Sequence, residues 1–203
     1  MQNAAFEKVK LEAEYKIFDI EPEKVDDFLN SLLRSNINGL NVTVPYKIKA
    51  YEFIKTYGTI DKDAEKLGAI NTIVIKNKSI FGYNTDATGF IRSLESNLKF
   101  YPEMKNVFIF GAGGAGTACA IKLAEVAEKI FISDTDQEKI KVFSERFFNY
   151  YGKEKLSVIE SKDKELKEAL QQCSLLVNAT PFGRNKDEML VKPEFLHEEI
   201  HIF

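Results

Sequence analysis

The chain has 203 residues, of which 44% are hydrophobic and 29% charged, and its formal net charge is −3. This composition is typical of a folded globular protein and excludes a disordered chain, and the small negative charge offers no attraction to nucleic acid or to an anionic membrane. No apolar run is long enough to cross a membrane, and the first residues lack the basic end and apolar stretch of a signal peptide. We therefore expect a cytoplasmic protein that binds neither nucleic acid nor a membrane.

Strand and helix patterns alternate along the first hundred residues, which predicts an α/β architecture. The predicted elements are a strand over 13–19, a helix over 22–35, a strand over 39–44, a helix over 46–56, a short helical piece over 61–67, strands over 69–75 and 78–83 that form a hairpin, and a helix over 87–98. A polar stretch over 99–106 that contains Pro102 has the composition of a junction. We expect a first domain over residues 1–100.

The second part of the chain repeats strand and helix strictly. Strands are predicted over 106–110, 129–133, 156–160 and 174–178, and helices over 114–127, 136–150 and 163–172. Because these strands are apolar along their whole length, we expect both faces of a parallel sheet to be covered by helices. Residues 101–203 are predicted to form a second domain of the Rossmann type.

A glycine-rich turn follows the first strand of this second domain and opens a helix. Gly111, Gly113 and Gly116 have the GxGxxG spacing, in which the first glycine permits a tight turn, the second lets backbone approach a diphosphate and the third lets helix and strand pack closely. The start of the helix adds unpaired N–H groups and the positive end of its dipole. The turn therefore predicts a dinucleotide site.

An acidic residue, Asp134, ends the next predicted strand. A carboxylate there can accept hydrogen bonds from the 2′-hydroxyl of an adenosine ribose and would repel a 2′-phosphate. No arginine follows before Arg146, so the residues favour NAD over NADP. The alternative is that Asp134 only caps the helix predicted to begin at 136.

Polar side chains gather at three strand ends of the first domain: Asn41, Thr43 and Lys47; Asn71 and Thr72; and Asn84, Thr85 and Asp86. Ligands of open α/β sheets bind at the carboxyl ends of strands. If these ends converge, they offer a hydroxylated small molecule hydroxyls, amides, a carboxylate and an ammonium. Each group also has a plainer interpretation: Asp86 or Thr85 as a helix cap, Lys47 as a solvated side chain, and Asn71 as a partner of backbone groups.

Cysteine and histidine give no sign of a metal site. Cys119 and Cys173 do not have a metal-ligand spacing, and we expect both to be buried thiols. His197 and His201 have a spacing that would place them on one helix face, but no HExxH motif or third ligand accompanies them.

Five motifs, in order, carry a family resemblance: "NVTVPYK" (41–47), "GAINT" (68–72), "GYNTDATG" (82–89), "GAGGAG" (111–116) and "NATPFG" (178–183). Together they resemble shikimate dehydrogenase along almost the whole chain. The resemblance implies an N-terminal α/β substrate domain followed by a Rossmann-like dinucleotide-binding domain. It also implies the NADP-dependent reversible reduction of 3-dehydroshikimate to shikimate in aromatic amino acid biosynthesis, by a monomer or homodimer.

The resemblance also assigns roles to residues. Lys47 corresponds to the catalytic lysine and Asp86 to its paired aspartate, while Thr43, Asn71 and Asp86 correspond to substrate contacts. The cofactor positions are Gly111, Ala112, Gly113, Gly114, Ala115, Gly116, Asp134, Thr135, Asn178, Thr180 and Pro181, of which the last three line the nicotinamide side. No metal is expected.

The sequence departs from the family pattern in two ways. The chain begins after the position of the family's serine loop and ends before its substrate-contacting glutamine, so we expect a chain truncated at both ends, with weak or no activity by itself. In place of an Asn-Arg-Thr/Ser segment it has Ser133-Asp134-Thr135. This resembles NAD-using quinate/shikimate dehydrogenases, so quinate, and an inactive nucleotide-binding fragment, stay open as alternatives.

Overall fold

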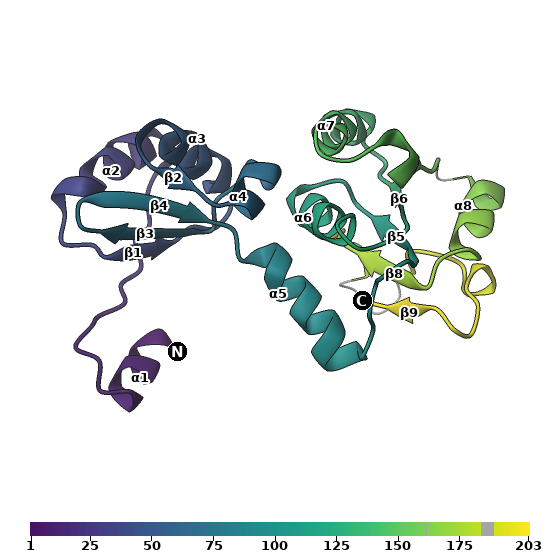
Figure 1. Ribbon diagram of the computed structural model, residues 1–203, viewed down its shortest axis with the longest axis horizontal. Coiled ribbons are helices and arrows are strands. Elements are labelled where there is room, and N and C mark those ends of the chain that lie inside the picture. Colours follow the sequence, from purple (N-terminus) through teal and green to yellow (C-terminus); the bar gives the residue numbers. More distant parts are fainter. Residues whose placement is uncertain (161, 184–188) are drawn as a thin grey trace. The chain divides into compact units, whose positions relative to one another are not determined.

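The computed structural model describes residues 1–160, 162–183 and 189–203. It divides into two compact units, Met1–Ile37 and Asn38–Phe203. Both β-sheets belong to the second unit (Figure 1). A domain boundary near residue 100 stays a prediction.

The first unit contains short helical segments and no strand among its residues. Its elements are α1 (Gln2–Lys8), η1 (Pro22–Lys24), α2 (Val25–Ser31) and η2 (Leu32–Arg34). The helix predicted over 22–35 is therefore confirmed, although its two ends are 3₁₀ turns, whereas α1 was not predicted. The strand predicted over 13–19 is wrong, because residues 11–20 have no ladder partner and a strand exists only where backbone groups pair with a neighbour.

A mixed sheet opens the second unit. Its strands are β1 (Gly39–Asn41), β2 (Thr59–Ile60), β3 (Thr72–Lys76) and β4 (Ser79–Tyr83), in the order β1-β3-β4-β2, and only β2 pairs parallel with its neighbour. The helices α3 (Lys47–Tyr57) and α4 (Lys62–Leu67) agree with the predicted ones. The strand predicted over 39–44 ends early at Asn41, and the chain turns at Val44 and Pro45, where proline has no N–H to pair. Strand β2 has only two residues and was not predicted.

The next helix, α5 (Asp86–Ser93), continues into a π-helical turn, η3 (Leu94–Leu98), and leads to a second sheet. This sheet has the order β7-β6-β5-β8-β9, and all of its pairs are parallel, as predicted. In chain order its elements are β5 (Asn106–Phe110), α6 (Gly114–Leu123), β6 (Lys129–Ser133), α7 (Gln137–Phe148), η4 (Lys153–Lys155), β7 (Leu156–Val158), α8 (Asp163–Leu170), β8 (Leu175–Asn178), η5 (Pro193–Phe195) and β9 (His201–Ile202).

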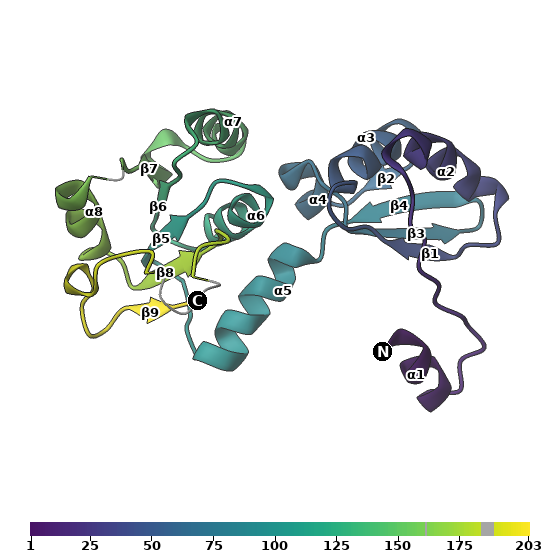
Figure 2. The ribbon, with the colours of Figure 1, turned by 180° about the vertical axis from the view of Figure 1, so that it is seen from behind.

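Helices cover both faces of the second sheet (Figures 1 and 2). On one face α5, α6 and α7 pack on side chains such as Val107 and Ile130, and on the other face α8 packs on Phe108 and Phe131. The order of the strands reverses between β5 and β8, and the carboxyl ends at such a switch point form the usual ligand crevice of open α/β sheets. The predicted α/β class with a Rossmann-like second half is confirmed.

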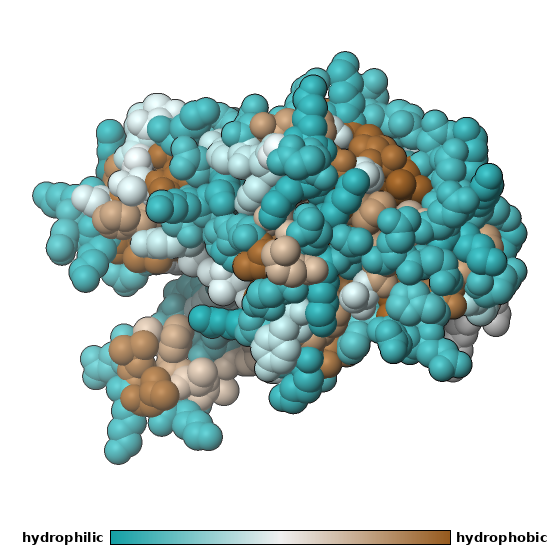
Figure 3. Space-filling model, turned by 45° about the vertical axis from the view of Figure 1, so that its right-hand side comes forward, coloured by the Kyte–Doolittle hydropathy of each residue, from teal (hydrophilic) through white to brown (hydrophobic). Residues whose placement is uncertain are grey.

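None of the described helices is both long and apolar enough to cross a membrane, and the face drawn in Figure 3 is mostly hydrophilic. Cys119 and Cys173 are free and buried, as expected. His201 lies in β9, so it does not share a helix face with His197. Within the described parts of the chain, no group of three or more histidine, cysteine or acidic side chains is placed to hold a metal.

Candidate functional site

A lysine and an aspartate that are distant in the sequence form an ion pair between the starts of two helices, α3 and α5. Lys47 is the first residue of α3, and Asp86 is the first residue of α5. The distance from Lys47 Nζ to Asp86 Oδ2 is 2.6 Å, and the two side chains are 28% and 47% exposed. A charged pair that remains open to solvent can also be reached by a small molecule.

A buried asparagine holds this aspartate in place. Asn71, which is 9% exposed, donates from Nδ2 to Asp86 Oδ1 at 2.8 Å and to Thr85 Oγ1 at 3.0 Å. Its Oδ1 accepts from Thr85 N and from Thr72 Oγ1. Asn71 thus satisfies a backbone group, as its plainer interpretation proposed, and also orients the Asp86 carboxylate toward Lys47. The Asp86 carboxylate bonds to the side chains of Asn71 and Lys47. Thr85, the N-cap residue of α5, makes no side-chain cap bond.

Thr43 lies in the turn between β1 and α3. It is exposed, and its carbonyl oxygen accepts from Tyr46 N at 2.9 Å. Thr43, which was predicted to lie in the strand 39–44, therefore lies in the turn that leads to Lys47.

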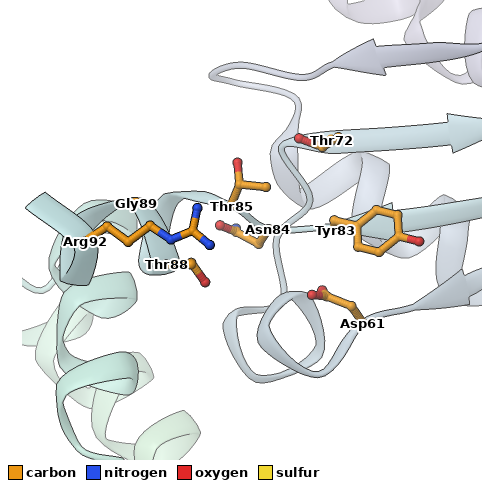
Figure 4. Close-up of a pocket in the computed structure, with 8 residues that line it drawn as sticks. All are labelled: Asp61, Thr72, Tyr83, Asn84, Thr85, Thr88, Gly89 and Arg92. Carbon is orange, nitrogen blue, oxygen red and sulfur yellow. The ribbon is translucent and has the colours of Figure 1, made fainter.

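A pocket of about 450 Å³ adjoins this network (Figure 4). It shares Thr72, Asn84 and Thr85 with the network, and neither Lys47 nor Asp86 lines it. Most of its lining residues are of polar types. Among those not named as site candidates from the sequence, Tyr83, Thr88 and Gly89 lie inside the motif 82–89, whereas nothing in the local pattern marks Asp61 and Arg92.

The glycine turn between β5 and α6 has the geometry that the dinucleotide prediction requires. Gly111 has φ of +98°, and a Cβ added to Gly116 would lie 1.8 Å from the carbonyl oxygen of Gly111. In contrast, a Cβ added to Gly113 or Gly114 would meet no atom within 4 Å. Gly113 caps α6 without a side-chain bond, so no capping side chain occupies the first N–H groups of the helix, an arrangement that suits a diphosphate.

Asp134 is bonded to the backbone of this turn. Its Oδ2 accepts from Ala112 N at 2.7 Å, and its Oδ1 accepts from Asp136 N at 2.9 Å. The alternative that Asp134 caps the next helix is wrong, since α7 is capped by Asp136, which accepts from the backbone of Glu138 and Lys139. Those backbone bonds, chiefly the one from Lys139, lower the pKa of Asp136. Thr135 is exposed between the two aspartates.

The segment after β8 packs against the glycine turn. Ala179 N donates to Phe110 O at 2.9 Å, and a Cβ added to Gly111 would lie 3.0 Å from Thr180. Asn178 stiffens the segment, because it accepts from Thr180 N and Oγ1 and donates to Phe182 O. Pro181 follows at an exposed position. The structure thus brings together the two segments that the sequence analysis predicted to bind the cofactor.

Two family models match the chain. The "Shikimate dehydrogenase substrate binding domain" matches residues 1–73, and the "Alanine dehydrogenase/PNT, C-terminal domain" matches residues 101–198. A shikimate dehydrogenase (NADP(+)) of Dehalococcoides mccartyi is 36% identical over 100% of this chain and 70% of its own length. The chain belongs to the shikimate dehydrogenase family.

Solved structures agree with this membership. A shikimate 5-dehydrogenase of Listeria monocytogenes, in complex with shikimate and NAD, has a TM-score of 0.88 at 26% identity and is matched over 99% of this chain and 71% of its own. A quinate dehydrogenase of Corynebacterium glutamicum, in complex with NAD, has a TM-score of 0.84 at 25% identity, over 98% and 72%. The family is one of NAD(P)-dependent oxidoreductases, and the recognition made from the five motifs is confirmed.

Proposed function

We propose that this chain catalyses the NAD(P)-dependent reversible reduction of 3-dehydroshikimate to shikimate, with Lys47 and Asp86 as the catalytic pair. The observation that carries this proposal is the 2.6 Å contact between Lys47 Nζ and Asp86 Oδ2, at the partly exposed starts of α3 and α5. Family membership supports the substrate class. The reaction belongs to aromatic amino acid biosynthesis, and two free, buried thiols are compatible with a reducing cytoplasm.

In the reduction, the carbonyl carbon gains a hydride and its oxygen gains a proton. The nicotinamide cofactor, when bound, supplies or receives the hydride. Lys47 donates a hydrogen bond to the carbonyl oxygen, stabilises the negative charge that develops there and gives up the proton, and it takes the proton back in the oxidation. Asp86 fixes the direction of the ammonium and accepts a hydrogen bond from a substrate hydroxyl.

The remaining substrate contacts are assigned to Thr43 and Asn71. The Thr43 hydroxyl is exposed in the turn that leads to Lys47, which makes it available to a hydroxyl or carboxylate of the substrate. Asn71 acts through its bond to Asp86, and its carbonyl oxygen is already shared by Thr85 and Thr72. We propose that residues 1–100 form this substrate domain and that residues 101–203 form the cofactor domain.

We assign the cofactor to the turn Gly111–Gly116, with Asn178, Thr180 and Pro181 on the nicotinamide side and Asp134 with Thr135 at the adenosine ribose. We further propose that NAD is preferred over NADP. The Asp134 carboxylate, which adjoins the turn through Ala112 N, can accept a ribose hydroxyl, whereas a 2′-phosphate would meet its negative charge.

Initial rates with shikimate and with quinate, each with NAD and with NADP, test the proposal. The highest kcat/KM with shikimate and NAD is expected. A higher value with quinate would favour the second candidate, a quinate/shikimate dehydrogenase, which the similarity to the Corynebacterium glutamicum structure supports.

Calorimetry tests the third candidate, an inactive nucleotide-binding fragment. If NAD binds while shikimate and quinate neither bind nor turn over, the dehydrogenase proposal is overturned and the fragment is left.

A further inference from the structure

Four charged side chains join helices α4 and α6 within the second unit. Asp63 and Lys66 come from α4, Lys122 comes from α6, and Glu125 lies just beyond its end. Lys66 Nζ lies 2.7 Å from Glu125 Oε1, Lys122 Nζ lies 2.9 Å from Glu125 Oε2, and Lys122 Nζ lies 3.2 Å from Asp63 Oδ1. The signs alternate along this chain of contacts, which we call the α4–α6 cluster.

The cluster is shielded from water on one side. Its four side chains are only 19–30% exposed. Tyr151 closes it, because its hydroxyl accepts from Lys66 Nζ at 3.1 Å and donates to Ile121 O at 2.9 Å. Beneath lies a small apolar core of Leu67, Ala87, Ala118 and Ile121.

The titration of these groups agrees with their contacts. Burial by itself would lower the pKa of Lys66 and of Lys122, but the bonds that each makes, above all to Glu125, outweigh this effect and raise both values. The same bonds overcome the effect of burial on Glu125 and lower the pKa of its carboxyl group. All three groups are therefore held in their charged forms by one another.

Each helix of the cluster leads directly to one half of the candidate site. After α4 the chain turns at Gly68, with φ of +60°, and then Ile70 N donates to Lys47 O at 2.9 Å. The next residue, Asn71, holds Asp86. At its other end, α6 begins in the turn assigned to the cofactor.

We propose that Asp63, Lys66, Lys122 and Glu125 are positioning residues, which fix α4 against α6 and thereby set the Lys47–Asp86 pair at the correct distance from the nicotinamide. This inference rests on the proposed function. Hydride transfer is sensitive to such placement, since a displacement of about 1 Å can cost on the order of a hundredfold in rate. Neither substrate nor cofactor needs to touch the cluster for it to act.

A kinetic test uses Lys66→Met, Glu125→Gln and the double variant. We expect each single change to lower kcat at least about tenfold, while KM for shikimate and Kd for NAD change less than about threefold, because each ligand is bound by only one half of the site. The double variant is expected to lose no more than the worse single variant, because both remove the same contact. Lys164→Met is the control, because Lys164 and its partner Glu168 are 87% and 65% exposed. Unchanged kcat in the single variants, or an equal loss in the control, would overturn the proposal.

A distance measurement separates this proposal from the proposed function. Spin labels are placed on Glu52→Cys in α3 and Lys141→Cys in α7, both at exposed positions. The native thiols are spared, because burial raises the pKa of both Cys119 and Cys173 to about 12. We expect Lys66→Met and Glu125→Gln to broaden the distance distribution and Lys164→Met to leave it unchanged.

The kinetic measurement and the distance measurement together distinguish a failure of the proposed function from a failure of the positioning role. A broadened distribution in a protein that oxidises neither shikimate nor quinate overturns the proposed function, and with it the catalytic part of this inference, while it supports the role of the cluster in fixing α4 against α6. An active protein whose distribution stays narrow in both cluster variants sinks the positioning role.

Discussion

At the scale of single residues, the site depends on one amide, that of Asn71, which joins the start of β3 to the start of α5. Asn71 is nearly buried, and a buried amide is costly unless its donors and acceptor are paired. All of its partners, Thr72, Thr85 and Asp86, belong to the strand ends that the sequence marks as polar. Asn71 is thus paired on both sides of its amide, and the Lys47–Asp86 ion pair that it supports remains partly open to solvent.

Removal of the lysine tests its catalytic role. In Lys47→Ala we expect turnover to fall by at least about a hundredfold, because the proton donor and its positive charge are both lost. The matched control is Lys55→Ala in the last turn of the same helix, where the ammonium lies over the Tyr51 ring at 5.8 Å. Steady-state kinetics and thermal melting of both variants are compared with the wild type. Turnover that stays within about threefold of the wild-type value would remove Lys47 from the mechanism.

A second substitution tests the choice of cofactor. In Asp134→Asn the charge that repels a 2′-phosphate is gone and the ribose loses a charged acceptor, so the ratio of kcat/KM for NAD to that for NADP should fall at least about tenfold. Asp136→Asn removes the same charge two residues away and keeps an acceptor for the helix cap. If both variants keep the wild-type ratio, Asp134 does not select the cofactor.

At the scale of elements, the sequence predicts those whose pattern is satisfied locally. Strands β5 and β6 and the glycine turn were predicted with nearly their observed bounds, because continuous apolar runs and glycine spacing are visible in a short window. The region 13–19 has a strand-like sequence but belongs to neither sheet, and the segment by itself does not show whether a neighbouring strand exists. The two-residue strand β2 carries too few residues to show any period.

Substitutions of two glycines of the turn are expected to change the stability of the fold and the affinity for NAD separately. In Gly116→Ala the new methyl group would lie 1.8 Å from the Gly111 carbonyl oxygen, a backbone atom that cannot move aside, so we expect a destabilisation of about 1–3 kcal/mol. In Gly113→Ala the methyl group meets no atom within 4 Å. It projects into the space assigned to the diphosphate, so stability is kept while NAD binding weakens at least about tenfold.

Urea unfolding and calorimetry measure the two effects. Wild-type affinity for NAD in Gly113→Ala would show that the turn does not receive the diphosphate.

At the scale of the whole molecule, the sequence offers candidates for the chemistry of the site but does not reveal the contacts that join its elements. The five motifs supplied candidate residues for both halves, since each motif is local. The α4–α6 cluster joins residues 59 positions apart, Lys66 with Glu125 and Asp63 with Lys122, through side chains that read as ordinary surface charges. Only the packed helices show that these charges are partly shielded and mutually paired.

These charges give the second unit a stability that depends on pH. The pKa of Glu125 is lowered from 4.5 in the folded protein, so its contribution is complete above that value and is lost as the pH falls through the lower folded value. The pKa values of Lys66 and Lys122 are raised from 10.5, so their contribution is complete below 10.5 and is lost as the pH rises through the higher folded values. The cluster therefore stabilises the fold fully between about pH 5 and 10.

Substitution of the shared carboxylate should remove the acid limb of this dependence. We expect Glu125→Gln to be less stable than the wild type at pH 7 but to lose less further stability between pH 7 and 3.5, because no carboxylate remains to be protonated there. The free energy of unfolding in urea is measured at both values. Glu168→Gln, which alters an exposed pair with a 4.0 Å contact, should retain the wild-type difference. An equal loss in Glu125→Gln and the wild type would mean that the cluster contributes nothing to the acid sensitivity of the fold.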